Sequence, residues 1–106
     1  MKKGKDFEDL ACSYLSELGY SILFRNFHCR YGEIDIIALD GDVVVFVEVK
    51  GTNSPLEPAE RINFKKLKRI YKCIDEFLSK NPAQACRVDA IIVKDRQIQH
   101  LKNISL

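Results

Sequence analysis

The sequence predicts a single α/β domain, spanning 1–106, in which helices flank a mixed β-sheet in the order α-β-β-β-α-β-β. Three features predict it: two segments with apolar residues at helical spacing, two β-branched segments joined by a turn signal, and an apolar run after the second helical segment. A chain of 106 residues with 46% hydrophobic and 30% charged content suits one compact globular domain.

The N-terminal segment predicts a helix followed by a short strand. Its apolar residues recur every three or four positions along one stripe, namely Phe7, Leu10, Ala11, Tyr14, Leu15 and Leu18. Gly19 can end this helix, because glycine readily adopts the left-handed conformation that follows helix C-termini. Residues 20–24 predict a strand, and the polar and basic residues 25–30 predict a connection.

Residues 33–39 and 43–50 predict a β-hairpin. Both segments are rich in apolar and β-branched residues, and the sequence DGD at 40–42 is a strong turn signal, so the two strands should be antiparallel. Residues 51–58 contain two prolines, glycine, asparagine and serine without periodicity, and they predict a loop beside the end of the second hairpin strand.

The second half of the chain predicts a helix and a strand that returns parallel to the hairpin. The helical stripe consists of Ile62, Leu67, Ile70, Tyr71, Ile74, Phe77 and Leu78, and Asn81-Pro82 ends it. Residues 87–93 predict a buried strand, 95–96 a turn and 98–104 a weaker strand. A helical crossover makes the strand at 87–93 parallel to the one at 43–50.

Bulk composition leaves the function open. The net charge of +2 does not demand a polyanionic partner, because the clustering of charges matters more than their sum. The charged N-terminus leads into an amphipathic segment, so we expect no signal peptide, no membrane span and a cytoplasmic location. The four cysteines, at 12, 29, 73 and 86, form no CxxC pair, and we expect reduced, mostly packed thiols.

Two histidines and one acid in the later strand predict no catalytic centre. His28 and His100 lack a partner for a zinc or nucleophile site. Asp89 stands beside Arg87, and we expect the two to form an internal ion pair that positions the strand.

Charged residues end a strand that otherwise has the composition of a central one. Glu48 and Lys50 are two residues apart, and the period of two along a strand places them on one face. Whether Asp35 shares that face depends on the turn. A two-residue loop at 40–41 puts Asp35 opposite residue 46, and a four-residue loop puts it opposite Glu48; both bring the three charges to one side, whereas a three-residue loop separates them.

Paired carboxylates at this place predict a metal site. Two close carboxylates repel each other, and one pKa rises unless a cation lies between them. A hard divalent ion, Mg²⁺ or Mn²⁺, prefers such oxygens, lowers the pKa of bound water and polarises phosphoryl oxygens. Lys50 could then orient or deprotonate the attacking water, or neutralise charge on the phosphate. The alternative is that Glu48 and Lys50 mark the solvent end of the strand, with Asp35 in an ordinary salt bridge to Lys50.

Residues 32–38 (GEIDIIA) and 45–50 (VFVEVK) together resemble the PD-(D/E)xK motif of restriction-endonuclease-like nucleases. More narrowly, the chain resembles the bacterial YraN family over nearly its whole length, and its first half is similar to archaeal Holliday-junction resolvases. The resemblance implies a restriction-endonuclease-like fold with Asp35 and Glu48 as metal ligands, Lys50 as the catalytic lysine and Glu8 as an accessory acid. Where that pattern continues with a polar residue and an arginine, this chain has Gly51-Thr52-Asn53, which puts the grip on substrate in doubt.

Other candidate residues have a functional and a structural interpretation. Glu8 can reach the edge of the sheet, but an acid in a first helical turn also suits the helix dipole. Lys66, Arg69 and Arg30 could contact phosphates as part of a basic surface, with Lys66 favoured because it flanks the buried stripe and matches the family pattern. The same lysines also suit a solvated helix face balanced by neighbouring acids.

Two hypotheses of different class follow. The first is a metal-dependent nuclease acting on the phosphodiesters of DNA, including branched or damaged DNA. The second is a catalytically silent module with the nuclease fold that binds nucleic acid or a protein partner. By analogy with junction-cutting relatives, we also expect a homodimer.

Overall fold

The computed structural model describes residues 3–52 and 64–104, and it confirms the predicted order of elements. Along the chain these are α1 (Lys3–Glu17), β1 (Ser21–Cys29), β2 (Gly32–Asp40), β3 (Val43–Thr52), α2 (Phe64–Lys80), β4 (Cys86–Lys94) and β5 (Gln97–Leu101). Gly19, with a φ of 94°, follows α1 as predicted. The fold is therefore α/β, in the order expected for a nuclease-like domain.

The five strands form one mixed sheet in the order β1-β2-β3-β4-β5. The β1–β2, β2–β3 and β4–β5 pairs are antiparallel, whereas β3 and β4 are parallel. The parallel pair requires a crossover, and α2 supplies it, as the sequence predicts. Both central strands are thus buried between neighbours, which suits their β-branched composition.

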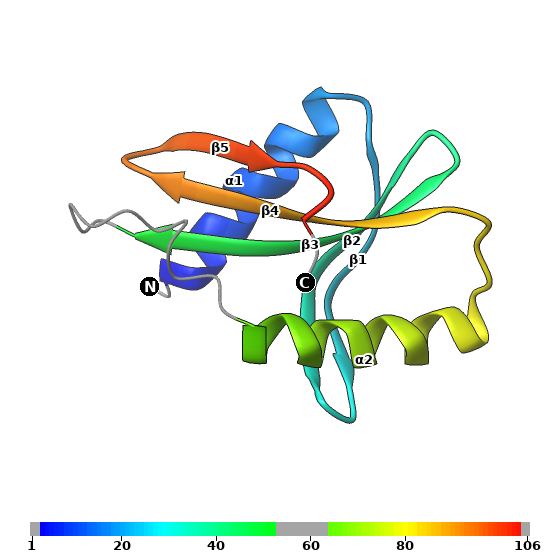
Figure 1. The fold of residues 1–106 in the computed structure, drawn as a ribbon. Coiled ribbons are helices and arrows are strands. Elements are labelled where there is room, and N and C mark those ends of the chain that lie inside the picture. Colours follow the sequence, from blue (N-terminus) through cyan, green and yellow to red (C-terminus); the bar gives the residue numbers. More distant parts are fainter. Residues whose placement is uncertain (1–2, 53–63, 105–106) are drawn as a thin grey trace.

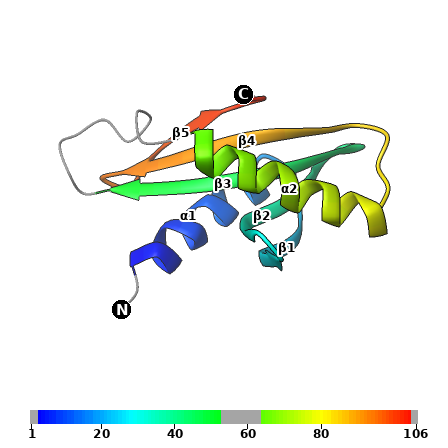
Figure 2. The same ribbon diagram turned by 60° about the horizontal axis from the view of Figure 1, so that its bottom comes forward.

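The two helices cover opposite faces of the sheet. Figure 1 shows α1 behind the strands and α2 in front, and Figure 2 shows the same layers from a second direction. Alternation along β3 explains the division: Val45 and Val47 pack in the cluster that includes Leu15 of α1, while Val44 and Phe46 pack in the cluster that includes Ile70 of α2. The acids and bases of β3 are therefore assigned to a layer by their parity.

The predicted connection at 25–30 is wrong for most of its length, because β1 continues through Cys29. Residues 24–29 pair with residues 32–37 of β2, so the hairpin extends to a turn at 30–31. Phe27 packs against the α2 cluster, with its ring 5.3 Å from that of Phe77. Burial of Phe27 and ladder hydrogen bonds outweigh the polar composition of the segment, which the sequence pattern could not reveal.

The expectation of four reduced thiols is also wrong, because Cys29 and Cys73 form a disulfide. The β1–β2 hairpin bends against α2 and brings residues 44 positions apart in sequence to a Cα–Cα distance of 5.6 Å. The other two cysteines are free: Cys12 is half-buried and Cys86 is exposed. A crosslink between a strand and a helix has no local sequence signal, so spacing alone could not predict it.

Two expectations fall partly outside the described residues. Gly51 and Thr52 belong to β3, while the rest of the predicted loop at 51–58, like Ile62, lies outside them. In the part of the chain that the structure describes, no helix is long and apolar enough to span a membrane.

Candidate functional site

The β2–β3 hairpin brings Asp35 level with Glu48. Its pairing begins at Asp40–Val43, leaving only residues 41 and 42 unpaired, and runs to Ile36–Val47. This is the register predicted for the four-residue loop, tightened by one additional pair. Extended by one position, the same register sets Asp35 opposite Glu48, just beyond the last paired residues.

Pairing on both sides of β2 becomes irregular at Asp35, and this frees its side chain for another role. The β2–β3 ladder stops at Ile36, and the backbone N–H of Val49 donates to Asp35 Oδ2 at 2.8 Å instead of to a strand carbonyl. On the other side Asn26, level with Asp35, has a φ of 54°, a conformation that asparagine tolerates better than most residues. The carboxylate is thereby held in the gap between strands.

Glu48 is a buried carboxylate with an incomplete set of partners. Its side chain is 3% exposed and lies on the α2 face of β3. Oε1 contacts Lys66 Nζ, from the first turn of α2, at 2.5 Å, whereas Oε2 is buried and accepts no hydrogen bond from the residues that the structure describes. A buried polar atom without a partner carries a large desolvation penalty, and this oxygen therefore has unused capacity to accept a hydrogen bond or a cation.

Asp35 and Glu48 interact unfavourably as two carboxylates. Burial, followed by the charge of Glu48, raises the pKa of Asp35 to about 7, against the partly compensating hydrogen bond from Val49. Asp35 therefore holds a proton more readily than an ordinary aspartic acid does. A cation between the two carboxylates would offset the charge of Glu48, which is the second cause of the raised pKa of Asp35.

Glu8 reaches the same region from α1. Its carboxylate lies 3.8 Å from the guanidinium of Arg25, which also binds Asp9 at 2.7 Å. Burial, and then the charge of Asp35, raises the pKa of Glu8, while Asn26 and Arg25 oppose the increase. The predicted accessory acid is thus within electrostatic range of Asp35, and Arg25 fixes its helix to β1.

Gly51 explains how α1 approaches the end of β3. A Cβ at this position would lie 1.9 Å from Cδ2 of Phe7, so any larger residue must displace that ring. The departure from the PD-(D/E)xK pattern after Lys50 therefore coincides with a close helix–strand contact. This contact places Glu8, the next residue after Phe7, beside the sheet.

Lys66, and not Lys50, forms the ion pair at this centre. Lys50 follows Glu48 on the α2 face of β3 and is partly exposed, and no ion pair joins it to a described residue. The salt bridge between Asp35 and Lys50 considered as the alternative is therefore absent. Lys66, predicted as a phosphate contact, instead has its ammonium on Glu48.

Arg69 and Arg30, the other predicted phosphate contacts, are exposed. Arg69 follows Lys66 by three residues on α2 and is close enough to influence its pKa. Arg30 stands at the tip of the β1–β2 hairpin, where its backbone N–H contacts Glu76 at 3.4 Å. Beside it, the ammonium of Lys72 lies 4.9 Å from the ring centre of Tyr31, so one basic side chain of α2 reaches the hairpin tip.

A second polar cluster lies on the α1 face of the sheet and includes His100. His100 Nε2 donates to Asp89 at 2.7 Å, and its Nδ1 contacts the Tyr14 hydroxyl at 3.1 Å. Asp89 also binds Arg87 at 3.0 Å, which confirms the predicted ion pair, and accepts the N–H of Asn103 at 2.9 Å. His28 contacts Glu33 at 3.4 Å on the surface.

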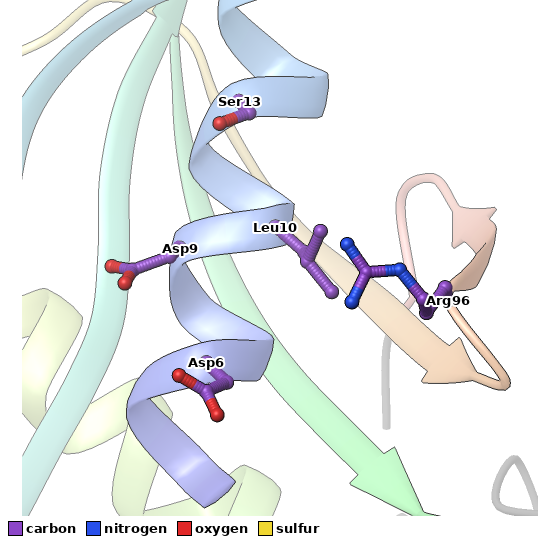
Figure 3. Close-up of a pocket in the computed structure, with 5 residues that line it drawn as sticks. All are labelled: Asp6, Asp9, Leu10, Ser13 and Arg96. Carbon is purple, nitrogen blue, oxygen red and sulfur yellow. The ribbon is translucent and has the colours of Figure 1, made fainter. Parts of the chain in front are cut away.

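A surface cavity lies away from both clusters. It has a volume of about 370 Å³ and is lined by Asp6, Asp9, Leu10, Ser13 and Arg96. Figure 3 shows Arg96 extended toward Leu10 on the outer side of α1, with Asp9 pointing to another side of the helix. None of the predicted site residues lines it. Among residues 3–52 and 64–104, no group of three or more His, Cys, Asp or Glu side chains is arranged to hold a metal, so the Asp35–Glu48 centre is a pair.

Three features of this centre were not predicted from the sequence. These are the pairing of Lys66 with Glu48, the attachment of α1 by Arg25, and the left-handed Asn26 beside Asp35. The lysine stripe and the polar stretch 25–26 were visible signals, but their partners lie on other elements.

Comparison with known proteins identifies relatives along the whole chain. A family model described as "Uncharacterised protein family UPF0102" matches residues 7–93. A UPF0102 protein of Helicobacter hepaticus is 46% identical over 105 residues, covering 98% of this chain and 94% of its own length. UPF0102 proteins of Campylobacter concisus and Thermotoga maritima are 44% and 40% identical, covering 97% and 100% of this chain and 93% and 99% of their own.

Proposed function

We propose that this chain, which belongs to the Uncharacterised protein family UPF0102, is a metal-dependent nuclease that hydrolyses phosphodiester bonds of DNA, branched or damaged DNA included. Membership agrees with the resemblance to the YraN family seen in the sequence. The relatives' names state no activity, so the proposal rests on the chemistry of the Asp35–Glu48 centre.

One observation carries the proposal: Oε2 of Glu48 is buried without a hydrogen-bond partner in the described part of the chain, in a carboxylate whose charge acts on Asp35. Two carboxylates in a low-dielectric setting favour a divalent cation, and an oxygen without a hydrogen-bond partner can serve as a ligand of that cation. The residues therefore fit a Mg²⁺ or Mn²⁺ ion, with Asp35 and Glu48 as protein ligands.

The chain's own residues supply the remaining roles. A bound divalent ion would lower the pKa of water and stabilise negative charge on a phosphoryl oxygen. We assign to Lys50 the neutralisation of the phosphate or the handling of the water proton, because it follows Glu48 on the same face of β3. We assign to Glu8 the exchange of a proton at the edge of the site, because its pKa is raised. Lys66, Arg69 and Arg30 are the phosphate contacts of the proposal.

Cleavage of labelled DNA tests the proposal. Duplex, single-stranded, flap and four-way-junction DNA are incubated with the purified chain in Mg²⁺ or Mn²⁺, and at least one should be cut. Asp35→Asn, Glu48→Gln and Lys50→Ala should each lower the rate by about a hundredfold or more. Asp42→Asn, at an exposed turn carboxylate of the same hairpin, should leave it unchanged. Failure of the wild-type chain to cut any substrate, or full activity of Asp35→Asn, would end the proposal.

A second candidate function is a catalytically silent module that binds nucleic acid or a protein. Lys66 favours it, because its ammonium already supplies a cation to Glu48. Such a module should show no Mg²⁺-dependent change in melting temperature and no cleavage product. Light scattering in the same buffers tests the homodimer that analogy suggests.

A further inference from the structure

We propose that Lys66 is an internal cation that occupies Glu48 in the metal-free protein and is released toward nucleic-acid phosphates when a divalent ion binds. The two binding events would thereby be coupled. This inference rests on the proposed role of Asp35 and Glu48 as metal ligands, and it assigns to Lys66 a positioning role between metal and substrate.

The two partners of this ion pair differ in their access to solvent. The Glu48 side chain is 3% exposed, whereas that of Lys66, on the first turn of α2, is 45% exposed. Lys66 Nζ contacts Oε1 of the carboxylate, and Oε2 has no hydrogen-bond partner among residues 3–52 and 64–104. The ammonium can therefore leave toward water by rotation of its side chain, while the carboxylate is held in the interior.

Charge balance explains why the ammonium should leave. Asp35 and Glu48 together carry at most two negative charges, and Lys66 offsets one of them. A divalent ion offsets both, so the ammonium becomes a surplus positive charge beside the metal. Repulsion between two cations that share one carboxylate favours release of the cation with access to solvent, and that cation is Lys66.

The surface outside the site is suited to receive the released side chain. Arg69 lies one turn further along α2 and is exposed, as are Lys65 and Lys68. A phosphodiester backbone along this part of α2 would meet these cations, and the Lys66 ammonium would add one more. Metal entry would therefore turn a residue that balances the site into one that contacts substrate.

Thermodynamic linkage gives the measurable consequence. If metal binding releases Lys66 to phosphate, metal must raise the affinity for DNA, and DNA must raise the affinity for metal by the same factor. If Lys66 instead remained on Glu48 and helped to hold the metal site together, its removal would weaken metal binding. The sign of the effect of one substitution therefore separates the two arrangements.

Calorimetric titration with Mn²⁺ and with Mg²⁺, in the absence of DNA, tests the first half. Lys66→Gln and Lys66→Met remove the competing charge and should bind metal about fivefold or more tightly than the wild-type chain. Lys65→Gln removes a neighbouring exposed lysine and should match the wild type. Thermal unfolding verifies that each variant folds, and two different side chains at position 66 guard against a single misfolded one. Equal or weaker metal binding by both Lys66 variants overturns the inference.

Fluorescence anisotropy with labelled duplex DNA tests the second half, in a Lys50→Ala background that prevents turnover. Saturating Mg²⁺ should raise DNA affinity about fivefold or more when Lys66 is present, and less than about twofold with Lys66→Gln. An equal increase in both overturns the coupling. The proposed nuclease activity is tested separately. Cleavage by the wild-type chain without tighter metal binding by the Lys66 variants would support the nuclease and reject this inference. Tighter metal binding by the variants without cleavage by the wild-type chain would support this inference and reject the nuclease.

Discussion

Asp89 and Glu48 are both buried carboxylates on adjoining strands, and they differ in how completely they are satisfied. Asp89 is level with Val47 of β3, so it faces α1 while Glu48, one residue further, faces α2. Asp89 accepts hydrogen bonds from Arg87, His100 and the backbone of Asn103. Glu48 has the Lys66 ammonium on one oxygen and, among the described residues, no donor on the other.

The pKa values follow this difference. Burial opposes ionisation of Asp89, but hydrogen bonds from Arg87, Asn103 and His100 outweigh it and lower the pKa of Asp89. At the other centre, burial and Glu48 raise the pKa of Asp35 to about 7. A buried carboxylate with all its partners supports the fold, whereas a pair that lacks them is suited to bind a cation.

The largest expected effect breaks the satisfied centre. Asp89→Asn removes the buried negative charge between Arg87 and His100 and leaves the half-buried Arg87 guanidinium with Asp40 and the Tyr20 hydroxyl as its remaining partners. We expect the free energy of unfolding, measured by urea denaturation, to fall by about 3–5 kcal/mol. Asp95→Asn, at an exposed turn after the same strand, is the matched control and should change it by less than about 0.5 kcal/mol. A loss for Asp89→Asn no greater than that of the control would remove the distinction between the two centres.

The second effect concerns what holds α2 against the sheet. The Cys29–Cys73 disulfide joins positions 44 residues apart and ties β1 to the helix that carries Lys66. Reduction should lower the free energy of unfolding by about 2–4 kcal/mol, because it releases a constraint on the unfolded chain. Urea denaturation with and without a dithiol reductant measures this. A Cys29→Ser/Cys73→Ser double variant should be insensitive to reductant, and equal sensitivity of both proteins would contradict the assignment.

The smallest effect sharpens the comparison through pH. Because the pKa of Asp35 is raised from its ordinary value, near 4, to about 7, the folded chain binds more protons than the unfolded one between these values. The stability of the metal-free protein should therefore fall as pH rises through this window. Asp35→Asn keeps an acceptor for Val49 and should be more stable than the wild type above pH 7 by about 1–2 kcal/mol, less than the full shift because the carboxyl is partly solvated.

Asp89 gives the opposite slope in a separate window. Because the pKa of Asp89 is lowered in the folded chain, its contribution to the free energy of unfolding is present above about pH 4. That contribution is lost as pH falls through the pKa of Asp89 in the folded chain. Thermal melts from pH 2 to 9 should show both slopes in the wild type. Asp35→Asn should lack the slope between about pH 4 and pH 7, and Asp42→Asn should keep both slopes. A neutral slope that persists in Asp35→Asn would assign it to another group.

Local patterns predicted much of this molecule. The stripe at Leu10 and Leu15, the DGD turn and the β-branched runs each specify an element through the period of its own side chains, and all appear in the fold. Strand β1 shows the limit of such patterns. Its second half is polar in sequence, and Phe27 packs against the core only because α2 folds over this part of the sheet.

In the candidate site, too, some residues could be predicted from local patterns and others could not. Asp35, Glu48 and Lys50 were selectable because charges at the end of an apolar strand are unusual and their spacing relates them. The turn left the pairing of Asp35 open between two registers, since both suit the same residues. The sequence could not show that Lys66 is the partner of Glu48, because several similar lysines lie nearby in the sequence. Only its position on α2 distinguishes Lys66 from them.

By itself, the sequence determined the elements, their order, the parallel crossover and the acids and bases of β2 and β3, because these depend on neighbours along the chain. Only the tertiary structure decided that Lys66 contacts Glu48, that Cys29 meets Cys73, and that Asp89 is satisfied while Glu48 is not. These contacts join residues from different elements, and the packing of both helices on the sheet sets their distances.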